Sequence, residues 1–298
     1  MPFAMAKGGK LYYEVTGRGD PIVFVHEFGG DHRSWETQVR HFSRRYRCVT
    51  YNARGYPPSD VPRRLGDYAQ AEQAEDVGRV MRHVGIKRAH VVGLSMGAFA
   101  ALHFGLRHPS MASSLTIAGC GSGAPKNARR QFQRDALAAA DALLKNGMAK
   151  HAAAIAAGPT RIQLRNKDPR GWAEFSRHLA DHSAKGSAMT LRGYQARRPS
   201  LYDMAAALRR LKVPTLLMVG DEDDPCLEAT LYLKRCIATA GLWIAPNTGH
   251  AINLEEPEAF NLMLENVRAR VEQCRWPRRD PRSIGGSSLL GTARKKRR

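Results

Sequence analysis

Three stretches of this sequence, far apart along the chain, carry side chains that could together cleave an acyl bond. Ser95 lies in the segment GLSMG (93–97), and an acidic run at 221–224 and His250 follow later in the chain. A serine hydroxyl is a weak nucleophile until a base accepts its proton, and a carboxylate can orient a histidine for that role. These residue types indicate nucleophilic attack on a carbonyl carbon, provided that the fold brings them together.

The segment around Ser95 is the strongest of the three signals because of what flanks it. A short apolar strand, AHVV (89–92), is expected to lead into it, and helical sequence, FAALHFGLRH (99–108), follows it. In this context a G-x-S-x-G segment forms a sharp turn with the serine in a strained conformation, and its small neighbours let strand and helix approach closely. We therefore predict that Ser95 projects from the carboxyl edge of a sheet as the nucleophile. A coincidental glycine-rich turn is the alternative.

His250 and the acidic run should reach the same edge of the sheet. His250 follows the predicted strand LWIA (242–245) and precedes a helix, and of the eleven histidines only this one has such a position late in the chain. The four acids at 221–224 directly follow the predicted strand PTLLMVG (214–220). We predict that His250 is the base and that one of these acids orients it, and the residues alone leave the choice among the four open.

Strands and helices alternate over most of the chain, which predicts a sheet able to position these loops. Seven short segments rich in β-branched or aromatic residues are typical of buried strands: 11–15, 21–25, 46–51, 89–93, 114–119, 214–220 and 242–245. Helical patterns fall between them, at 34–42, 70–84, 96–108, 227–237 and 257–274. We predict an α/β fold with a mostly parallel central sheet flanked by helices.

Two segments depart from this alternation and also hold the whole net charge of +20. Residues 125–212 are rich in Ala and Arg, show helical periodicity without a convincing strand, and contain 18 Lys and Arg against 6 Asp and Glu. Residues 275–298 contain 9 against 1, with Pro, Gly and Ser and few apolar side chains. We predict a helical insertion at 125–212, a basic, disordered tail at 275–298, and a core made of 1–124 and 213–274.

With these features the sequence resembles the α/β-hydrolase family over nearly all of residues 10–274. The resemblance rests on the order of the strands, the serine turn, the acidic turn, the histidine loop and an insertion placed where the family carries its helical cap. It implies an α/β-hydrolase fold in which residues 125–212 form the cap.

The resemblance also implies which acid serves the histidine. The family pattern is G-x-x-D after a strand, and three residues after Gly220 stands Asp223. Asp221 and Asp224 remain the alternatives. The acid would accept the second N–H of His250, fix its tautomer and stabilise the imidazolium.

Two backbone donors for the developing oxyanion are implied in the same way, the N–H groups of Met96 and Phe28. Phe28 lies in HEFGG (26–30), which resembles the family's H-G-x-G, but Glu27 stands in place of the first glycine. Either the backbone needs no positive φ there or the loop is shifted, and a carboxylate so close to an oxyanion must turn away or be paired. The segment 52–60 resembles the family's next loop and is expected to be structural.

These features predict a serine hydrolase, like a carboxylesterase or lactonase, that cleaves an ester, lactone or related acyl bond of a small molecule through an acyl-enzyme. Serine at position 95 argues against the family's haloalkane dehalogenases and epoxide hydrolases, which use aspartate. A cap of net charge +12 favours an anionic substrate, such as a carboxylate-bearing lactone, an enol-lactone or a diketo acid, and argues against a prolyl aminopeptidase. Two alternatives stay open: a carbon–carbon bond hydrolase acting on a diketo acid, and an inactive member of the fold that only binds a ligand.

No cofactor or metal is expected. The five cysteines are odd in number, scattered and never in a C-x-x-C pair, which indicates neither a disulfide framework nor a zinc site. No stretch approaches the roughly 18 apolar residues of a membrane helix, and the start lacks the apolar block of a signal peptide, so we expect a cytoplasmic protein without a membrane span. The terminal KKRR attracts polyanions, but no nucleic-acid-binding motif accompanies it, and we expect no dedicated nucleic-acid partner.

Overall fold

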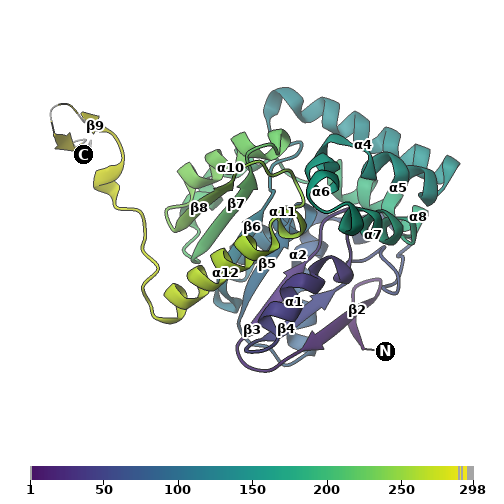
Figure 1. Ribbon diagram of the computed structural model, residues 1–298, viewed down its shortest axis with the longest axis horizontal. Helices are drawn as coiled ribbons and strands as arrows, with labels where there is room; N and C mark the ends of the chain where they lie inside the picture. Colours follow the sequence, from purple (N-terminus) through teal and green to yellow (C-terminus); the bar gives the residue numbers. More distant parts are fainter. Residues whose placement is uncertain (1, 288, 290, 294–298) are drawn as a thin grey trace.

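The computed structural model describes residues 2–287, 289 and 291–293, and its centre is an eight-stranded sheet (Figure 1). The strands follow the order β1-β2-β4-β3-β5-β6-β7-β8, with β1 and β2 antiparallel to their neighbours and β3 to β8 parallel. Their bounds are β1 Phe3–Ala6, β2 Gly9–Thr16, β3 Pro21–Val25, β4 Arg47–Tyr51, β5 Ala89–Leu94, β6 Ala112–Ala118, β7 Thr215–Gly220 and β8 Ala240–Ala245. The predicted α/β fold with a mostly parallel central sheet is confirmed.

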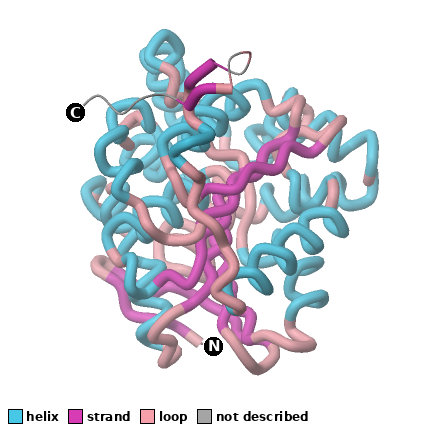
Figure 2. Tube along the Cα trace, turned by 90° about the vertical axis from the view of Figure 1, so that its left-hand side faces the viewer, coloured by secondary structure: helices cyan, strands magenta, loops and turns pink. Residues whose placement is uncertain are grey.

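Helices cover both faces of this sheet, as the view in Figure 2 shows. On one face lie α1 (Glu36–Phe42) and α12 (Pro257–Glu272), and on the other lie α2 (Gln70–His83), α3 (Met96–Arg107) and α10 (Asp224–Cys236). Each layer of helices encloses its own hydrophobic core against the sheet.

Strand β3 shows how the sequence serves both cores. Val23 and Val25 are buried against the layer of α2 and α3, whereas Ile22 and Phe24 are buried against the layer of α1 and α12. Successive side chains of a strand point to opposite faces, so a strand covered on both sides must be apolar without a break. This is why PIVFV could be recognised as a buried parallel strand.

All seven predicted strands are present, but β1 was missed. It has four residues, FAMA, of which only Ala4 is fully buried, and it pairs with β2 at the edge of the sheet. Gly8, with φ of 85°, supplies the turn between the two strands. A short edge strand without β-branched residues carries too weak a pattern to be predicted from sequence.

The predicted helical insertion lies between β6 and β7 and contains six helices, the first five of which gather at one end of the sheet in Figure 1. They are α4 (Lys126–Asn146), α5 (Met148–Ala156), α6 (Ile162–Lys167), α7 (Pro169–Ala180), α8 (Ala184–Thr190) and α9 (Ala205–Arg210). Leu143, Leu164 and Leu179 are fully buried in a small core that most of these helices share. This core also touches Phe28 and Ala251, which belong to loops of the main body, so the insertion is packed onto the sheet end.

The segment predicted as a disordered tail begins with an anchored residue. Trp276 packs against Gly241 of β8, and its indole N–H donates to Thr239 O at 2.7 Å. Beyond it the chain runs away from the end of α12 in Figure 1 and includes a 3-10 turn at Pro281–Ser283 and a two-stranded pairing of β9 (Gly286–Ser287) with β10 (Thr292–Ala293). The terminal residues 294–298, with the KKRR sequence, lie outside the described residues, as do 288 and 290.

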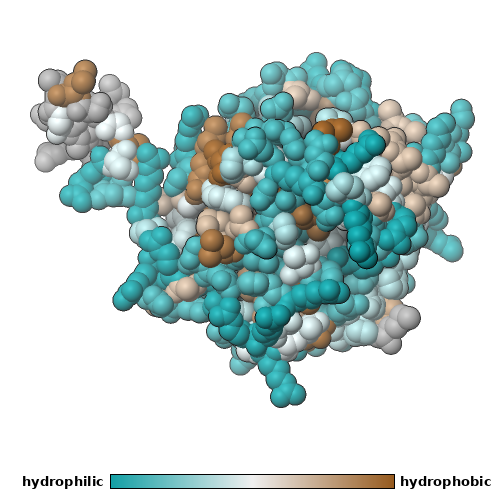
Figure 3. Space-filling view, viewed as in Figure 1, coloured by the Kyte–Doolittle hydropathy of each residue, from teal (hydrophilic) through white to brown (hydrophobic). Residues whose placement is uncertain are grey.

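Hydrophilic side chains cover most of the face shown in Figure 3, with hydrophobic residues scattered among them. Among the helices formed by the described residues, none combines the length and the apolar composition that a membrane crossing needs.

The loop after β4, expected to be structural, is held by a buried ion pair. Arg54, only 1% exposed, binds Asp76 of α2 through two hydrogen bonds of 2.6 and 2.7 Å. Its remaining nitrogen donates to the carbonyls of Lys7 and Asp67, at 2.9 and 2.6 Å. One guanidinium therefore joins the β1–β2 turn, the loop after β4 and helix α2.

Replacing Asp76 by alanine should destabilise the fold by about 3–5 kcal/mol, because it leaves the Arg54 guanidinium buried without a counter-charge. Urea unfolding followed by circular dichroism would measure the loss. Glu36→Ala is the matched control, since it removes a carboxylate that pairs with Arg40 on the exposed surface, and it should leave the midpoint nearly unchanged. Equal shifts for the two variants would contradict a structural role for Arg54.

Candidate active site

Ser95 lies at the turn between β5 and α3, where the backbone is strained. Its φ of 52° and ψ of −112° are unusual for a residue with a side chain. The turn is held by the Ser95 N–H, which donates to Ala118 O at 2.8 Å, and by the Phe99 N–H, which donates to Ser95 O at 3.1 Å. Ser95 is half-buried and follows the carboxyl end of β5, the position expected for it.

Two glycines make this turn possible. A Cβ on Gly97 would lie 2.1 Å from Val25 O, and a Cβ on Gly93 would lie 2.3 Å from Gly97 O. Neither separation is compatible with a side chain, so the first turn of α3 can rest on β3 and β5 only with glycine at both positions. The two glycines of the G-x-S-x-G pattern are thus required by the close packing of the α3 backbone against β3 and β5.

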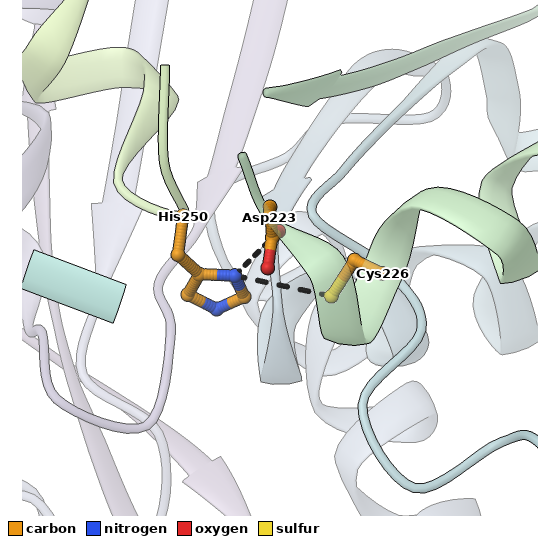
Figure 4. Close-up of side chains that lie close together, drawn as sticks. All are labelled: Asp223, Cys226 and His250. Atoms are coloured by element: carbon orange, nitrogen blue, oxygen red, sulfur yellow. Dashed lines mark hydrogen bonds and ion pairs between the residues drawn. The ribbon is translucent and has the colours of Figure 1, made fainter. Parts of the chain in front are cut away.

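The loops after β7 and β8 lie side by side and bring Asp223 to His250 (Figure 4). The Glu222 N–H donates to Thr248 O, and the Thr248 N–H donates to Asp221 Oδ1, both at 3.0 Å. His250 Nδ1 lies 2.7 Å from Asp223 Oδ2. Because an ionised carboxylate can only accept, the imidazole donates its Nδ1–H and its Nε2 is left free to accept a proton.

The structure distinguishes among the candidate acids. Asp223 is 2% exposed and contacts the imidazole, whereas Asp221 and Asp224 are exposed. Asp221 accepts the Thr248 backbone N–H, so it ties the two loops together. The acid that the family pattern implied is therefore the one brought to His250.

Glu255, which sequence reasoning did not single out, fixes the backbone on both sides of His250. Its carboxylate accepts the N–H of Gly249 at 2.5 Å and that of Ala251 at 2.9 Å, and it is buried in α11 (Ile252–Glu255). A glutamate shortly after a loop histidine was a weak signal, since any helix start favours acidic residues.

The pair of Asp223 and His250 shifts the acidities of both groups. Burial alone would lower the pKa of His250, but the charge of Asp223 and the hydrogen bond to it raise that pKa well above its ordinary value. Burial would raise the pKa of Asp223, but the neighbouring His250 holds it below its ordinary value. The carboxylate is thus ionised at neutral pH and stabilises the imidazolium that forms when His250 accepts a proton.

Cys226 also contacts the imidazole, a role that the scattered cysteines of the sequence did not indicate. Its Sγ lies 3.9 Å from His250 Nδ1 (Figure 4). The thiol donates to Gly119 O at 3.2 Å. Ser122 Oγ lies 3.5 Å from the same sulfur. Burial raises the pKa of the Cys226 thiol, so it stays protonated and serves as a neutral contact on the side of Asp223.

Among the described residues, one group of side chains has ligand atoms spaced closely enough for a metal ion: Asp223, Cys226 and His250, within 4.8 Å of one another. The group does not suit a metal ion, because two of its three ligand atoms, Asp223 Oδ2 and His250 Nδ1, are hydrogen-bonded to each other. The third is a thiol kept in its protonated form, and a metal requires the thiolate.

Ser95 and His250 approach the end of β6 from two sides. The Ser95 N–H bonds to Ala118, and the next residue, Gly119, lies against the imidazole, where a Cβ would come within 3.3 Å of the ring. Within the described part of the chain, Ser95 Oγ makes no hydrogen bond, so Ser95 and His250 are not hydrogen-bonded to each other in this structure. Catalytic hydrogen bonds commonly tighten only when substrate is bound.

The amides expected as oxyanion donors, those of Phe28 and Met96, lie in backbone that is held from the other side. Tyr56 Oη donates to Phe28 O and Tyr194 Oη donates to Met96 O, each at 2.9 Å. Among the described residues neither amide N–H donates to a protein acceptor. Both residues therefore have a fixed carbonyl and a free backbone N–H. Two free N–H groups in fixed backbone can bind an anion.

Glu27, the residue that departs from the family loop, is buried and paired. Among the described residues that are not glycine, positive φ occurs at Ser95, Asn247 and Cys274. Glu27 is not one of them, so its backbone does not require a glycine. Its Oε2 accepts from the guanidinium of Arg161, which the insertion contributes and which is 3% exposed. The same oxygen lies 4.0 Å from His250 Nε2. The sequence required this carboxylate either to turn away from the expected oxyanion or to be paired. The structure shows it paired, with Arg161.

A small cavity of about 240 Å³ opens beside Ser95. It is lined by core residues and by residues of the insertion, and its walls are largely apolar: Phe28, Phe132, Ala136, Ala139, Ile155 and Leu191. Ser122, Asp135, His151, Gln195 and Arg198 add polar groups. A larger groove of about 600 Å³ lies between α1 and α7, but it contains neither Ser95 nor His250.

The sheet, the serine turn and the loops that follow β7 and β8 define an α/β-fold hydrolase. The chain belongs to the α/β hydrolase fold family, whose model matches residues 20–257.

Individual proteins agree with this assignment. The chain is 26% identical over 257 residues to 3-oxoadipate enol-lactonase 1 of Acinetobacter baylyi, covering 85% of this chain and 91% of the relative. It is 28% identical over 283 residues to a protein of Azorhizobium caulinodans with the provisional name carbamate hydrolase RutD, covering 92% and 100%. The crystal structure of the enol-lactonase from Burkholderia xenovorans LB400 has the same fold, with a TM-score of 0.78 at 22% identity, covering 90% and 100%.

The pKa of His250 should lie above its ordinary value of about 6.5 and should fall when Asp223 is replaced by asparagine. The carboxylate stabilises the imidazolium, so its removal leaves burial, which favours the neutral ring. NMR titration of the imidazole nitrogens would measure both values. Asp221→Asn, a substitution in the same acidic turn away from the imidazole, should leave the pKa in place. An unchanged pKa in Asp223→Asn would show that this carboxylate does not set it.

Arg161→Met should destabilise the protein by about 3–5 kcal/mol, because Glu27 is left buried without its counter-charge. The double variant Arg161→Met with Glu27→Gln should regain at least half of the loss, since no charge then stays unpaired. Denaturant midpoints of the four proteins would give the coupling. Additive losses in the double variant would contradict a direct pair between the insertion and this loop.

Proposed function

We propose that this protein hydrolyses an ester or lactone of a small molecule through an acyl-enzyme. In this proposal Ser95 is the nucleophile, His250 the base and Asp223 the acid that orients the base. The observation that carries it is the 2.7 Å hydrogen bond between Asp223 and His250 at the sheet edge where the strained Ser95 turn also lies. An ester or lactone is favoured because a relative that aligns over most of the chain is named an enol-lactonase.

The order of proton transfers follows from the hydrogen bond between His250 Nδ1 and Asp223. With Nδ1 donating to Asp223, His250 accepts the Ser95 proton at Nε2 while Oγ attacks the carbonyl carbon. The imidazolium then returns this proton to the departing oxygen, which leaves an ester of Ser95. Water attacks that ester with the same base, and the acid product and free Ser95 are released.

Negative charge on the carbonyl oxygen would be met by the backbone N–H groups of Phe28 and Met96. One such donor contributes about 2.7–4 kcal/mol of barrier lowering where a donor has been removed in another hydrolase. The Glu27 carboxylate would oppose this charge if it were free, and its pairing with Arg161 supports the assignment because it cancels that field.

In this proposal residues 125–212 act as a cap on a core formed by 1–124 and 213–274. The support is the cavity beside Ser95, in which Phe132, His151 and Leu191 of the insertion complete the wall. At about 240 Å³ the cavity is at or below the small end of ligand pockets, which run from roughly 300 to 1,000 Å³, so a small substrate is expected.

Turnover of short p-nitrophenyl esters and of simple lactones should fall by roughly 10⁴-fold or more in Ser95→Ala and in His250→Ala, and the double variant should be little worse than either. Ser113→Ala, a serine at the opposite end of β6, is the control and should retain wild-type rates. Labelling by a fluorophosphonate probe should occur in wild type and be lost in Ser95→Ala.

Undiminished turnover in Ser95→Ala would remove the proposed mechanism. Cleavage of a diketo acid in place of all esters and lactones would identify a carbon–carbon bond hydrolase. A folded wild-type protein that neither turns over the panel nor reacts with the probe would identify a fold member that only binds a ligand.

A further inference from the structure

One guanidinium in the cavity beside Ser95 is buried without an acidic partner. Arg198, in the insertion after α8, is 3% exposed. It donates to Ser122 O at 2.6 Å and to the side-chain oxygen of Gln195. The ring of Phe99 lies against it at 3.8 Å, and that of Phe132 lies at 5.2 Å, measured to the ring centres.

The other buried arginines of the described chain each meet a carboxylate. Arg54 pairs with Asp76, Arg161 with Glu27 and Arg268 with Glu272. Arg198 forms no ion pair within the described residues, and its buried Nε has no hydrogen-bond partner there. A guanidinium carries five N–H groups, and two protein acceptors leave most of them unused.

This arrangement is costly unless something else compensates the charge. Burial lowers the pKa of Arg198 to about 10, so the group is still a cation at neutral pH. A buried charge without a counter-charge destabilises a fold, and aromatic faces offset only part of that cost. The sequence nevertheless keeps the cation in the wall of a cavity, where a ligand can reach it.

The position of Arg198 relative to Ser95 is fixed by the start of α3. Phe99, whose ring the guanidinium covers, is one helical turn after Ser95, and its N–H donates to Ser95 O. Ser95, Arg198 and Gln195 line the same cavity, and most of the remaining wall is apolar. The cavity's own carboxylate, Asp135, is exposed and accepts from Gln131 at 2.7 Å.

We propose that Arg198 binds a carboxylate of the substrate, so that the ester or lactone that this protein cleaves carries a carboxylate at the far end of its acyl chain. The assignment rests on the proposed function of Ser95. A bidentate contact suits the geometry, because guanidinium and carboxylate are both planar and matched in spacing. The apolar wall between the two groups would take the intervening methylenes.

Two esters of equal chain length test this directly. The p-nitrophenyl monoester of glutaric acid carries a terminal carboxylate, and p-nitrophenyl pentanoate carries a methyl group in its place. Wild type should favour the glutarate ester by about 10- to 100-fold in kcat/KM, mainly through KM, since a hydrogen-bonded charge is recognised with that strength. Arg198→Gln should lose this preference, because its kcat/KM should fall at least tenfold more on the glutarate ester than on the pentanoate ester. Arg198→Lys, which keeps the charge without the planar fork, should retain part of it.

Arg197→Gln is the matched control. Arg197 is the neighbouring residue, it is exposed, and its loss changes the charge of the insertion by the same amount. The preference should survive in this variant, whereas an equal loss in Arg197→Gln would assign it to the general field of the insertion. Equal rates on the two esters in wild type, or an equal loss on both in Arg198→Gln, would overturn the proposal while leaving Ser95 as nucleophile.

A binding measurement separates this inference from the proposed catalysis. Calorimetric titration of Ser95→Ala with the glutarate monoester should show binding, and the same titration of Ser95→Ala with Arg198→Gln should show at least a tenfold weaker affinity. Equal affinities would overturn the role of Arg198. Retained binding together with unaltered hydrolysis in Ser95→Ala would instead overturn the proposed nucleophile and leave the carboxylate site standing.

Discussion

The close packing of α3 against the backbone of β3 and β5 is the constraint on which the candidate site depends. With no room for a Cβ at Gly93 or Gly97, the chain must reverse within one residue, and that residue is Ser95. The strained φ and ψ of Ser95 are the local cost of this packing. The buried helix α3, seated between the sheet and α2, offsets that cost through its apolar contacts.

A second set of contacts fixes His250 and the cavity relative to this turn. Arg198 donates to Ser122 O, Ser122 Oγ meets Cys226, and the sulfur of Cys226 lies against His250. The insertion therefore touches the imidazole through a short chain of side chains as well as through Arg161 on Glu27. Because the insertion contacts both the loop of Glu27 and the wall behind His250, it would in the proposed function position the groups that act on a substrate as well as enclose it.

Ion pairs with the main body reduce the positive charge of the insertion. Its net charge of +12 predicted a general attraction for anions. In the structure Arg161 pairs with Glu27 and Lys167 with Glu256, and both carboxylates lie outside the insertion, so they neutralise part of this excess. Among the described residues, Arg198 is the buried arginine that lacks an acidic partner, and it lies in the wall of the cavity.

The features that could be predicted from sequence are those that depend on a short local pattern of residues. Strand β3 could be predicted because both of its faces are apolar, and Ser95 because its glycines are required by packing. Asp223 could not be separated from Asp221 and Asp224 by residue type, and the family spacing was needed. Arg161 and Arg198 lie in a stretch of many arginines, and only the folded chain shows which of them are buried. The sequence required the Glu27 carboxylate to turn away from the expected oxyanion or to be paired, but it could not name the partner, Arg161, which lies 134 residues away.

The central claim, a covalent ester on Ser95, is tested most directly by acid-quenching the enzyme during turnover of an activated ester and mapping the modified peptide by mass spectrometry. We expect one acyl group, on Ser95, that appears within the first turnover and disappears as substrate is exhausted. An acyl group on another residue, such as Cys226, or sustained hydrolysis with no acylated peptide under conditions that trap the intermediate, would contradict it.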